Sequence, residues 1–105
     1  MRRPQIVEKI RTAMHTFIPE AETYLYGSEA RGEARADSDF DLLVLLPDSL
    51  SRDDFRQRRD DIFSVLFDIE VENRSDISPL ILQQNEWYSR TSLFTINVTK
   101  DRILL

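Results

Sequence analysis

The chain has 105 residues, enough for one hydrophobic core but short of two, so we expect a single domain over residues 1–105. Hydrophobic residues make up 41% and charged residues 31% of the sequence, a balance typical of folded rather than disordered proteins. The formal net charge of −5 disfavours general binding to nucleic acid, because such binding depends on Lys and Arg side chains that displace phosphate counterions.

The first predicted element is an amphipathic helix over residues 4–18. Its apolar residues recur at helical spacing, Pro4 suits the first turn, and Pro19 ends the helix. Charged residues interrupt the apolar positions, so the segment does not read as a signal peptide, and no run has the length of a membrane span. We therefore expect a cytoplasmic protein without membrane contact. His15 on this helix is expected to face solvent.

Two strands are predicted on either side of a Gly-Ser pair. Residues 23–26 are rich in β-forming side chains and end at Gly27. Residues 41–46 are continuously apolar, which indicates a strand buried on both faces near the centre of a sheet. Between the strands, residues 28–34 are expected to start a helix.

A long helix is predicted from Ser51, a residue type that caps helix N-termini. Its exposed face carries oppositely charged residues four positions apart, for which weak ion pairs are expected: Asp54 with Arg58, and Arg56 with Asp60. This pattern favours a solvated helix face over a basic patch for a partner.

The last third of the chain is less regular. Residues 76–83 are expected to form a strand, with Pro79 indicating a sheet edge or an irregular position. Residues 91–99 have strand propensity, and a short helix is the alternative. Trp87 and Tyr88 are expected to pack in the core or an interface rather than to stack on a base. The alternation of helices and strands predicts an α/β (α+β) fold with a small sheet flanked by helices.

The Gly-Ser pair is a candidate phosphate site. Gly27 and Ser28 would occupy a strand-to-helix turn, where backbone N–H groups and the positive end of the helix dipole attract an anion. Gly27 lets the backbone approach the ligand, Ser28 supplies a hydroxyl, and Arg31 adds a charge-assisted contact.

Two carboxylates stand at the start of the second strand. Alternate residues of a strand share a face, so Asp39 and Asp41 are expected to point the same way while Phe40 enters the core. Such a pair suits a hard cation such as Mg²⁺, which also takes phosphate oxygens. Because cysteine is absent, a metal here would need oxygen ligands or the single histidine.

The stretch "GSEARGEARADSDFDLLV", residues 27–44, resembles the signature of the DNA polymerase β-like nucleotidyltransferase superfamily: Gly-Ser, ten residues, then Asp-x-Asp leading into an apolar strand. Its motifs "GSxARG" and "SDxDLLV" are similar to those of the minimal nucleotidyltransferases, small domains related to the catalytic part of kanamycin nucleotidyltransferase. The flanking helices and "DISPLIL" also resemble that group in order and length. The resemblance implies a polymerase β-like fold with a mixed sheet.

The resemblance also implies roles for the signature residues. Gly27 and Ser28 would hold the nucleoside triphosphate, with Arg31 and Ser38 as further nucleotide-binding residues. ATP is the expected substrate.

The carboxylates of the signature would form a two-metal Mg²⁺ site. Asp39 and Asp41 would ligate the ions, and a third carboxylate normally comes from a neighbouring strand. Asp76 is the candidate, and it would complete the metal site and help to deprotonate the attacking hydroxyl. Glu70 and Glu72 are the alternatives for this third position.

The implied reaction is in-line attack of a hydroxyl on the α-phosphorus of the nucleotide, with pyrophosphate leaving. Prokaryotic members of the group often act as antitoxins beside a HEPN-domain ribonuclease toxin. A HEPN-domain toxin is thus the expected acceptor of AMP, with a hetero-oligomer of the two proteins among the expectations. Two alternatives remain open: a non-catalytic binding antitoxin of the same fold, and a small-molecule nucleotidyltransferase similar to the aminoglycoside-modifying enzymes, which the apparent lack of an acceptor domain disfavours.

Overall fold

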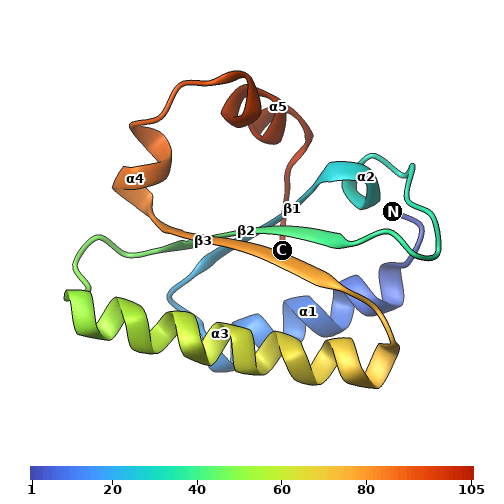
Figure 1. Cartoon of the computed structure of the whole chain (residues 1–105), viewed down its shortest axis with the longest axis horizontal. Coiled ribbons are helices and arrows are strands. Elements are labelled where there is room, and N and C mark those ends of the chain that lie inside the picture. Colours follow the sequence, from blue (N-terminus) through green and yellow to red (C-terminus); the bar gives the residue numbers. More distant parts are fainter.

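The computed structural model describes all residues, 1–105, and is built on a four-stranded mixed sheet in the order β3-β2-β1-β4 (Figure 1). Strand β1 (Glu22–Tyr26) pairs antiparallel with β2 (Phe40–Leu46) and with the short β4 (Ile103–Leu104). Strand β3 (Ile77–Gln83) pairs parallel with β2. The α/β class with a small mixed sheet is confirmed.

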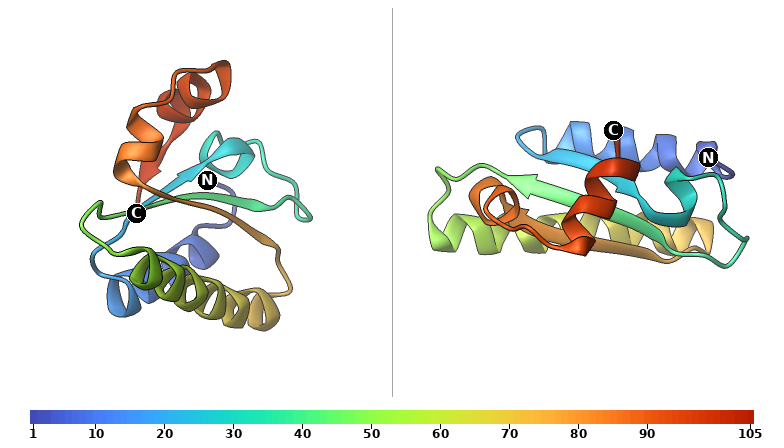
Figure 2. Two further views of the ribbon diagram at one scale, coloured as in Figure 1. Left: turned by 60° about the vertical axis from the view of Figure 1, so that its left-hand side comes forward. Right: turned by 90° about the horizontal axis from the view of Figure 1, so that it is seen from above.

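Figure 2 shows that helices lie on both faces of this sheet. Helices α1 (Pro4–Phe17) and α3 (Arg52–Asn73) cover one face, and α3 provides the crossover that a parallel β2–β3 pair requires. Helices α4 (Gln84–Tyr88) and α5 (Leu93–Asp101) lie over the other face. The short helix α2 (Gly27–Ala30) follows β1 directly. None of these helices combines the length and apolarity needed to cross a membrane.

Strand β2 is buried on both faces, as its apolar sequence predicted. One set of its side chains packs with α1 and α3, namely Phe40, Leu42, Val44 and Leu46. The alternate set packs with α4 and α5 in a second cluster that contains Leu43, Leu45, Trp87 and Val98. Because Asp41 alternates with Phe40 and Leu42, its side chain belongs to the α4–α5 face.

Local signals placed the longest elements correctly. Ser51 caps α3, its Oγ accepting a hydrogen bond from the Asp54 backbone N–H at 3.1 Å. Strand β3, which carries Pro79, lies at the sheet edge. His15 is exposed, and its Nε2 lies 3.1 Å from the Leu105 carbonyl oxygen.

The ion pairs expected on α3 are wrong. Asp54 does not pair with Arg58, nor Arg56 with Asp60. Arg58 instead bonds to Asp61 at 3.1 Å and to Glu20, which follows α1. Its Nη2 also donates to the Phe17 carbonyl at 3.1 Å, so tertiary contacts with the end of α1 decide where this guanidinium lies.

Residues 91–99 do not form the strand that their propensity predicted, and the short-helix alternative is confirmed by α5. A reciprocal capping box begins this helix: the Thr95 N–H donates to Ser92 Oγ at 3.1 Å, and the Ser92 N–H donates to Thr95 Oγ1 at 3.0 Å. Packing of Val98 in the second cluster then outweighs the β propensity. Trp87 is buried as expected, whereas Tyr88 is 56% exposed and so lies outside the core.

Candidate active site

The Gly-Ser turn and the second aspartate of the signature meet across the β1–β2 pair. Tyr26, the last residue of β1, lies opposite Asp41 in the antiparallel register. Gly27 follows with φ 74°, a conformation that glycine adopts without strain. A Cβ on Gly27 would overlap Oδ2 of Asp41 and lie 3.2 Å from its Cγ. Glycine is therefore required here both by backbone conformation and by the close carboxylate.

Helix α2 is shorter than the sequence predicted. It begins at Gly27, and its C-cap is Arg31, so the expected helix over 28–34 is wrong beyond its first turn. Ser28 lies in that turn, and its carbonyl accepts the Glu33 N–H at 2.8 Å. Gly32, with φ 73°, then turns the chain toward β2. The N–H groups of a first helical turn have no intrahelical partners, so the turn keeps donors for an anion.

Arg31 connects this turn to α5. Its guanidinium bonds to Glu33 at 3.0 Å and to Asp101 at 3.1 Å. These two carboxylates raise the pKa of the Arg31 guanidinium further, the Glu33 hydrogen bond having the larger effect. Arg31 thus stands beside Gly27 as predicted, with carboxylate partners that the sequence did not indicate.

A cavity of about 170 Å³ separates the turn from α5. Tyr26 packs edge-to-face on Phe94, with ring centroids 6.0 Å apart. The cavity is lined by these two rings and by Gly27, Arg31, Asn97, Val98 and Asp101. Helix α5 therefore forms one wall of the candidate site, which the sequence reading missed because it expected a strand there; the Ser92–Thr95 capping pattern was the available signal.

Asp39 and Asp41 come together on one face, as predicted. Oδ2 of Asp39 accepts a hydrogen bond from Ser78 Oγ at 3.0 Å, while the half-buried Asp41 carboxylate accepts none. Burial raises the pKa of Asp41 above its usual value, and the nearby charge of Asp39 raises it further, against a smaller lowering by Arg31.

This donor set fits a hard divalent cation. Asp41 offers two oxygens without hydrogen-bond donors, and the repulsion between the two carboxylates is the kind that a bound cation relieves. Mg²⁺ sites commonly use one or two carboxylates and complete their coordination with water and substrate phosphate oxygens. Asp39 and Asp41 would hold such an ion.

Asp76 does not join the pair closely. Its backbone carbonyl accepts the Phe40 N–H at 2.9 Å, and its exposed side chain precedes β3, beside Asp39. No three carboxylate or imidazole side chains of the chain are close enough to hold a metal ion together. Ser78 occupies the register position opposite Asp41.

The two alternatives for the third carboxylate have other contacts. Glu70 Oε2 accepts the Ile77 N–H at 3.1 Å, where β3 begins. Glu72 is 70% exposed and pairs with Lys9 of α1 at 3.7 Å. Neither side chain lies with Asp39 and Asp41.

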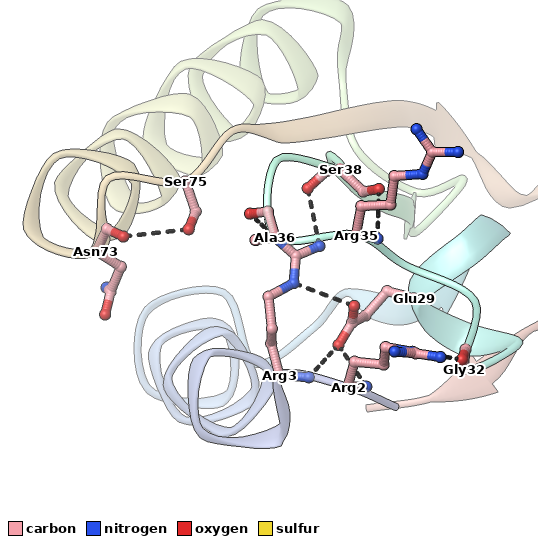
Figure 3. Close-up of polar contacts among 9 residues, drawn as sticks. All are labelled: Arg2, Arg3, Glu29, Gly32, Arg35, Ala36, Ser38, Asn73 and Ser75. Atoms are coloured by element: carbon pink, nitrogen blue, oxygen red, sulfur yellow. Dashed lines mark hydrogen bonds and ion pairs between the residues drawn. The ribbon is translucent and has the colours of Figure 1, made fainter.

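An arginine at the start of α1 holds the loop that precedes Asp39 (Figure 3). Arg3 Nη2 donates to the Ser38 carbonyl at 2.8 Å, and Nη1 donates to the Ala36 carbonyl at 3.3 Å. The same guanidinium stacks on the Phe40 ring at 3.9 Å from its centroid. Both neighbours of Asp39 are thereby attached to one side chain.

Glu29 holds this arginine in place (Figure 3). Its carboxylate is fully buried and pairs with Arg3 Nε at 3.2 Å. Oε1 also accepts the backbone N–H groups of Arg2, at 3.0 Å, and Arg3, at 2.5 Å. These bonds satisfy a charge that would otherwise be costly to bury. Sequence reasoning missed the pair because its members are 26 positions apart and no local pattern marks either one.

Ser38, a predicted nucleotide-binding residue, also shapes this loop. Its Oγ accepts the Arg35 N–H at 2.9 Å, and its own N–H donates to the Arg35 carbonyl at 3.1 Å. The hydroxyl proton is not used by these bonds and remains available as a donor.

Comparisons with known proteins agree with this arrangement. The family model of the nucleotidyltransferase domain matches residues 7–102. In fold, the chain is similar to a minimal nucleotidyltransferase, with a TM-score of 0.63 and 20% identity over 100% of this chain and 97% of that one. It is also similar to a toxin–antitoxin with AMP-PNP (TM-score 0.56, 22% identity, 92% of this chain and 69% of that one). A variant of the toxin–antitoxin MntA–HpeT gives a TM-score of 0.55 at 21% identity, over 92% and 69% of the two chains.

No curated protein matches the sequence. At these identities the structural likeness shows the fold, whereas the family model covers nearly the whole chain, including the Gly-Ser turn and both aspartates. The resemblance seen in the sequence is therefore confirmed: the chain belongs to the nucleotidyltransferase domain family.

Proposed function

We propose that this protein is a Mg²⁺-dependent nucleotidyltransferase that transfers AMP from ATP to a hydroxyl of a partner protein. The observation that carries the proposal is the close packing of Gly27 on Asp41, with Asp39 on the same face of the sheet. A turn suited to phosphate and a carboxylate pair suited to Mg²⁺ lie side by side, as transfer at a nucleotide phosphorus requires.

The triphosphate would bind at the turn. Ser28 would donate its hydroxyl, and Ser38 has a hydroxyl proton to offer. Arg31 is exposed, so its guanidinium can exchange Glu33 or Asp101 for a phosphate oxygen. The cavity of about 170 Å³ beside Gly27 fits part of a nucleotide, since whole small-molecule sites usually measure about 300–1,000 Å³.

The reaction would be displacement at the α-phosphorus. The acceptor oxygen forms a bond to phosphorus, the bond from that phosphorus to the pyrophosphate oxygen breaks, and the acceptor proton is removed by a base. Bound Mg²⁺ would neutralise the negative charge on the phosphates and on the leaving group. Asp39 and Asp41 would hold it. Asp76 is the proposed third carboxylate and base, which a rotation of its exposed side chain toward Asp39 would bring into reach.

We infer that the acceptor belongs to a toxin of the HEPN class, with which the protein would form a hetero-oligomer. Two of the similar structures are toxin–antitoxin complexes, one of them with a nucleotide analogue, and this supports the inference. The second candidate is a non-catalytic binding antitoxin. It is favoured because Asp76 does not complete a three-carboxylate metal group with Asp39 and Asp41.

The test is transfer of label from α-labelled ATP, with Mg²⁺, to proteins of the source cell's lysate. The Asp39→Asn, Asp41→Asn variant should lose the labelling. An Asp60→Asn, Asp68→Asn variant is the matched control, because both side chains are exposed on α3 and form no ion pair. Equal labelling by all three proteins, or none by the unmodified chain while it still captures the toxin, would favour the binding antitoxin.

A further inference from the structure

A larger cavity, of about 680 Å³, lies away from the candidate active site. It is bounded by the start of α1, residues 33–36 and the turn that joins α3 to β3, where Asn73 and Ser75 face Arg3 and Ala36 in Figure 3. None of the proposed nucleotide or metal residues lines it. The site described above therefore does not explain this cavity.

The lining is strongly basic although the whole chain carries a charge of −5. Four arginines line the cavity, Arg2, Arg3, Arg35 and Arg74, against a single carboxylate, that of Glu33. The Glu33 carboxylate already pairs with Arg31, which lies outside the cavity, at 3.0 Å. Only Arg3 has an acidic partner of its own, the buried Glu29, so three guanidinium groups form no ion pair within the protein.

The fold anchors the backbones of these three residues and leaves their head groups free. Arg74 ends α3 in a left-handed conformation with φ 50°, and the next residue donates its N–H to the Glu70 carbonyl at 3.2 Å. The Arg35 N–H is held by Ser38, while its guanidinium extends outward without a partner in Figure 3. Arg2 uses only Nε, which donates to the Gly32 carbonyl at 2.9 Å, so both terminal nitrogens remain free.

We propose that this cavity binds a compact phosphate-bearing anion, either free pyrophosphate or the phosphates of a nucleotide. Guanidinium groups bind phosphate oxygens through paired, charge-assisted hydrogen bonds, and three arginines without an acidic partner are among the residues that line one cavity of the size usual for small ligands. No aromatic side chain lines the cavity, so a base would find no stacking surface and the phosphate itself is the recognised group. The acidic remainder of the surface repels a long nucleic acid.

The anion site is separate from the candidate active site, and a single loop connects the two. Residues 33–36 line the cavity, and the chain continues from them through Ser38 to Asp39. A phosphate bound there would contact the same loop that Arg3 attaches to α1, and so would reduce its motion.

The test follows the arginine Nε–Hε NMR signals during titration of the full chain with inorganic pyrophosphate. A chelator keeps metal out, so that the aspartate pair cannot recruit the anion. Signals of Arg2, Arg35 and Arg74 are expected to shift together with one dissociation constant. Comparison with ATP distinguishes the sources: equal or tighter binding of ATP assigns the site to nucleotide phosphates, and tighter binding of pyrophosphate assigns it to the free anion.

Two double variants make the result specific. Arg35→Gln with Arg74→Asn should weaken pyrophosphate binding by about tenfold or more, and asparagine tolerates the left-handed conformation at 74. Arg52→Gln with Arg56→Gln removes two exposed, unpaired arginines of α3 outside the cavity and should leave binding unchanged. Equal weakening by both variants, shifts spread over all exposed arginines, or tighter binding of a hexaglutamate peptide or a 5′-phosphorylated oligonucleotide would overturn the proposal. If the cavity variant fails to fold, the arginine signals of the unmodified chain still show whether pyrophosphate binds at Arg2, Arg35 and Arg74.

Discussion

Gly27 and Asp41 are in contact across the β1–β2 pair, so closely that a Cβ on the glycine would overlap the carboxylate oxygen. The phosphate-binding turn and the metal-binding pair are thus parts of one packed unit. Burial of Asp41 beneath this turn and the charge of Asp39 act together on its pKa.

Replacement of Gly27 by alanine should abolish nucleotidyl transfer and destabilise the protein by about 2–3 kcal/mol, because both a left-handed φ and a steric clash are imposed. Gly32→Ala is the matched control. It has a similar φ of 73°, but its new Cβ would meet no atom closer than 3.8 Å. That variant should lose about 1 kcal/mol and keep its activity. Urea unfolding and labelling assays on both variants check this, and equal activities would argue against the role of the Gly27–Asp41 contact.

Replacement of Asp41 by asparagine should stabilise the metal-free protein at neutral pH while it abolishes transfer. The pKa of Asp41 in the native state is raised above its usual value of 3.8. At a pH between 3.8 and this raised pKa, the native state therefore binds more protons than the unfolded state. Stability therefore falls as the pH rises through this window, and the asparagine variant escapes that loss. Urea unfolding in a chelator should show the advantage at pH 7 and its disappearance as the pH approaches 3.8. A less stable variant at neutral pH would contradict the account.

Replacement of Arg3 by lysine should lower kcat more than it changes KM for ATP. Lysine keeps a charge for Glu29 but cannot donate to Glu29 and to the Ala36 and Ser38 carbonyls in the same fork geometry. Asp39 would then be less well positioned, although the phosphate turn is untouched. Arg52→Lys is the control, since Arg52 is exposed on α3, forms no ion pair and lies outside both cavities near this loop. If thermal stability falls while kcat and KM stay unchanged, Arg3 has a structural role only and does not position Asp39.

Replacement of Glu20 by glutamine should cost about 1 kcal/mol at pH 7 through loss of its pair with Arg58. The Arg58 hydrogen bond lowers the pKa of Glu20 below its usual value of 4.5. The stabilisation is therefore complete above that value and is lost as the pH falls through the lowered pKa. Unfolding curves of the two proteins should converge in acid. Glu72→Gln, at a side chain that is 70% exposed, should change stability by less than about 0.5 kcal/mol at any pH.

Much of the fold follows from short-range patterns. The apolar run of β2, the helical spacing of α1 and the Ser51 cap of α3 each lie within a few residues, and the structure contains all three elements. The strand prediction for residues 91–99 is wrong for a physical reason. The β propensity of branched and aromatic residues does not take account of the capping pair that starts the helix. Where a capping box and a buried helical face agree, they outweigh propensity.

The site was predictable only in part. The Gly27 turn and the two aspartates are close in sequence, and the shared face of Asp39 and Asp41 was predicted from strand alternation. The antiparallel pairing that brings Asp41 opposite Tyr26 is known only from the structure. The contacts that complete the site join distant positions: Arg3 with Glu29, 26 residues apart, and Arg31 with Asp101, 70 residues apart. Neither pair has a local signature. For the same reason the sequence could not show that Asp76 does not complete a three-carboxylate group with Asp39 and Asp41.

The most direct measurement compares ATP labelled at the α-phosphorus with ATP labelled at the γ-phosphorus as donors to the purified toxin partner. The account predicts that only the α-label reaches the partner, that pyrophosphate is released in equal amount, and that Asp41→Asn abolishes both. Transfer of the γ-label would show phosphoryl rather than nucleotidyl transfer. Undiminished α-labelling by the Asp41→Asn variant would contradict the central claim that the carboxylate packed on Gly27 supports the reaction.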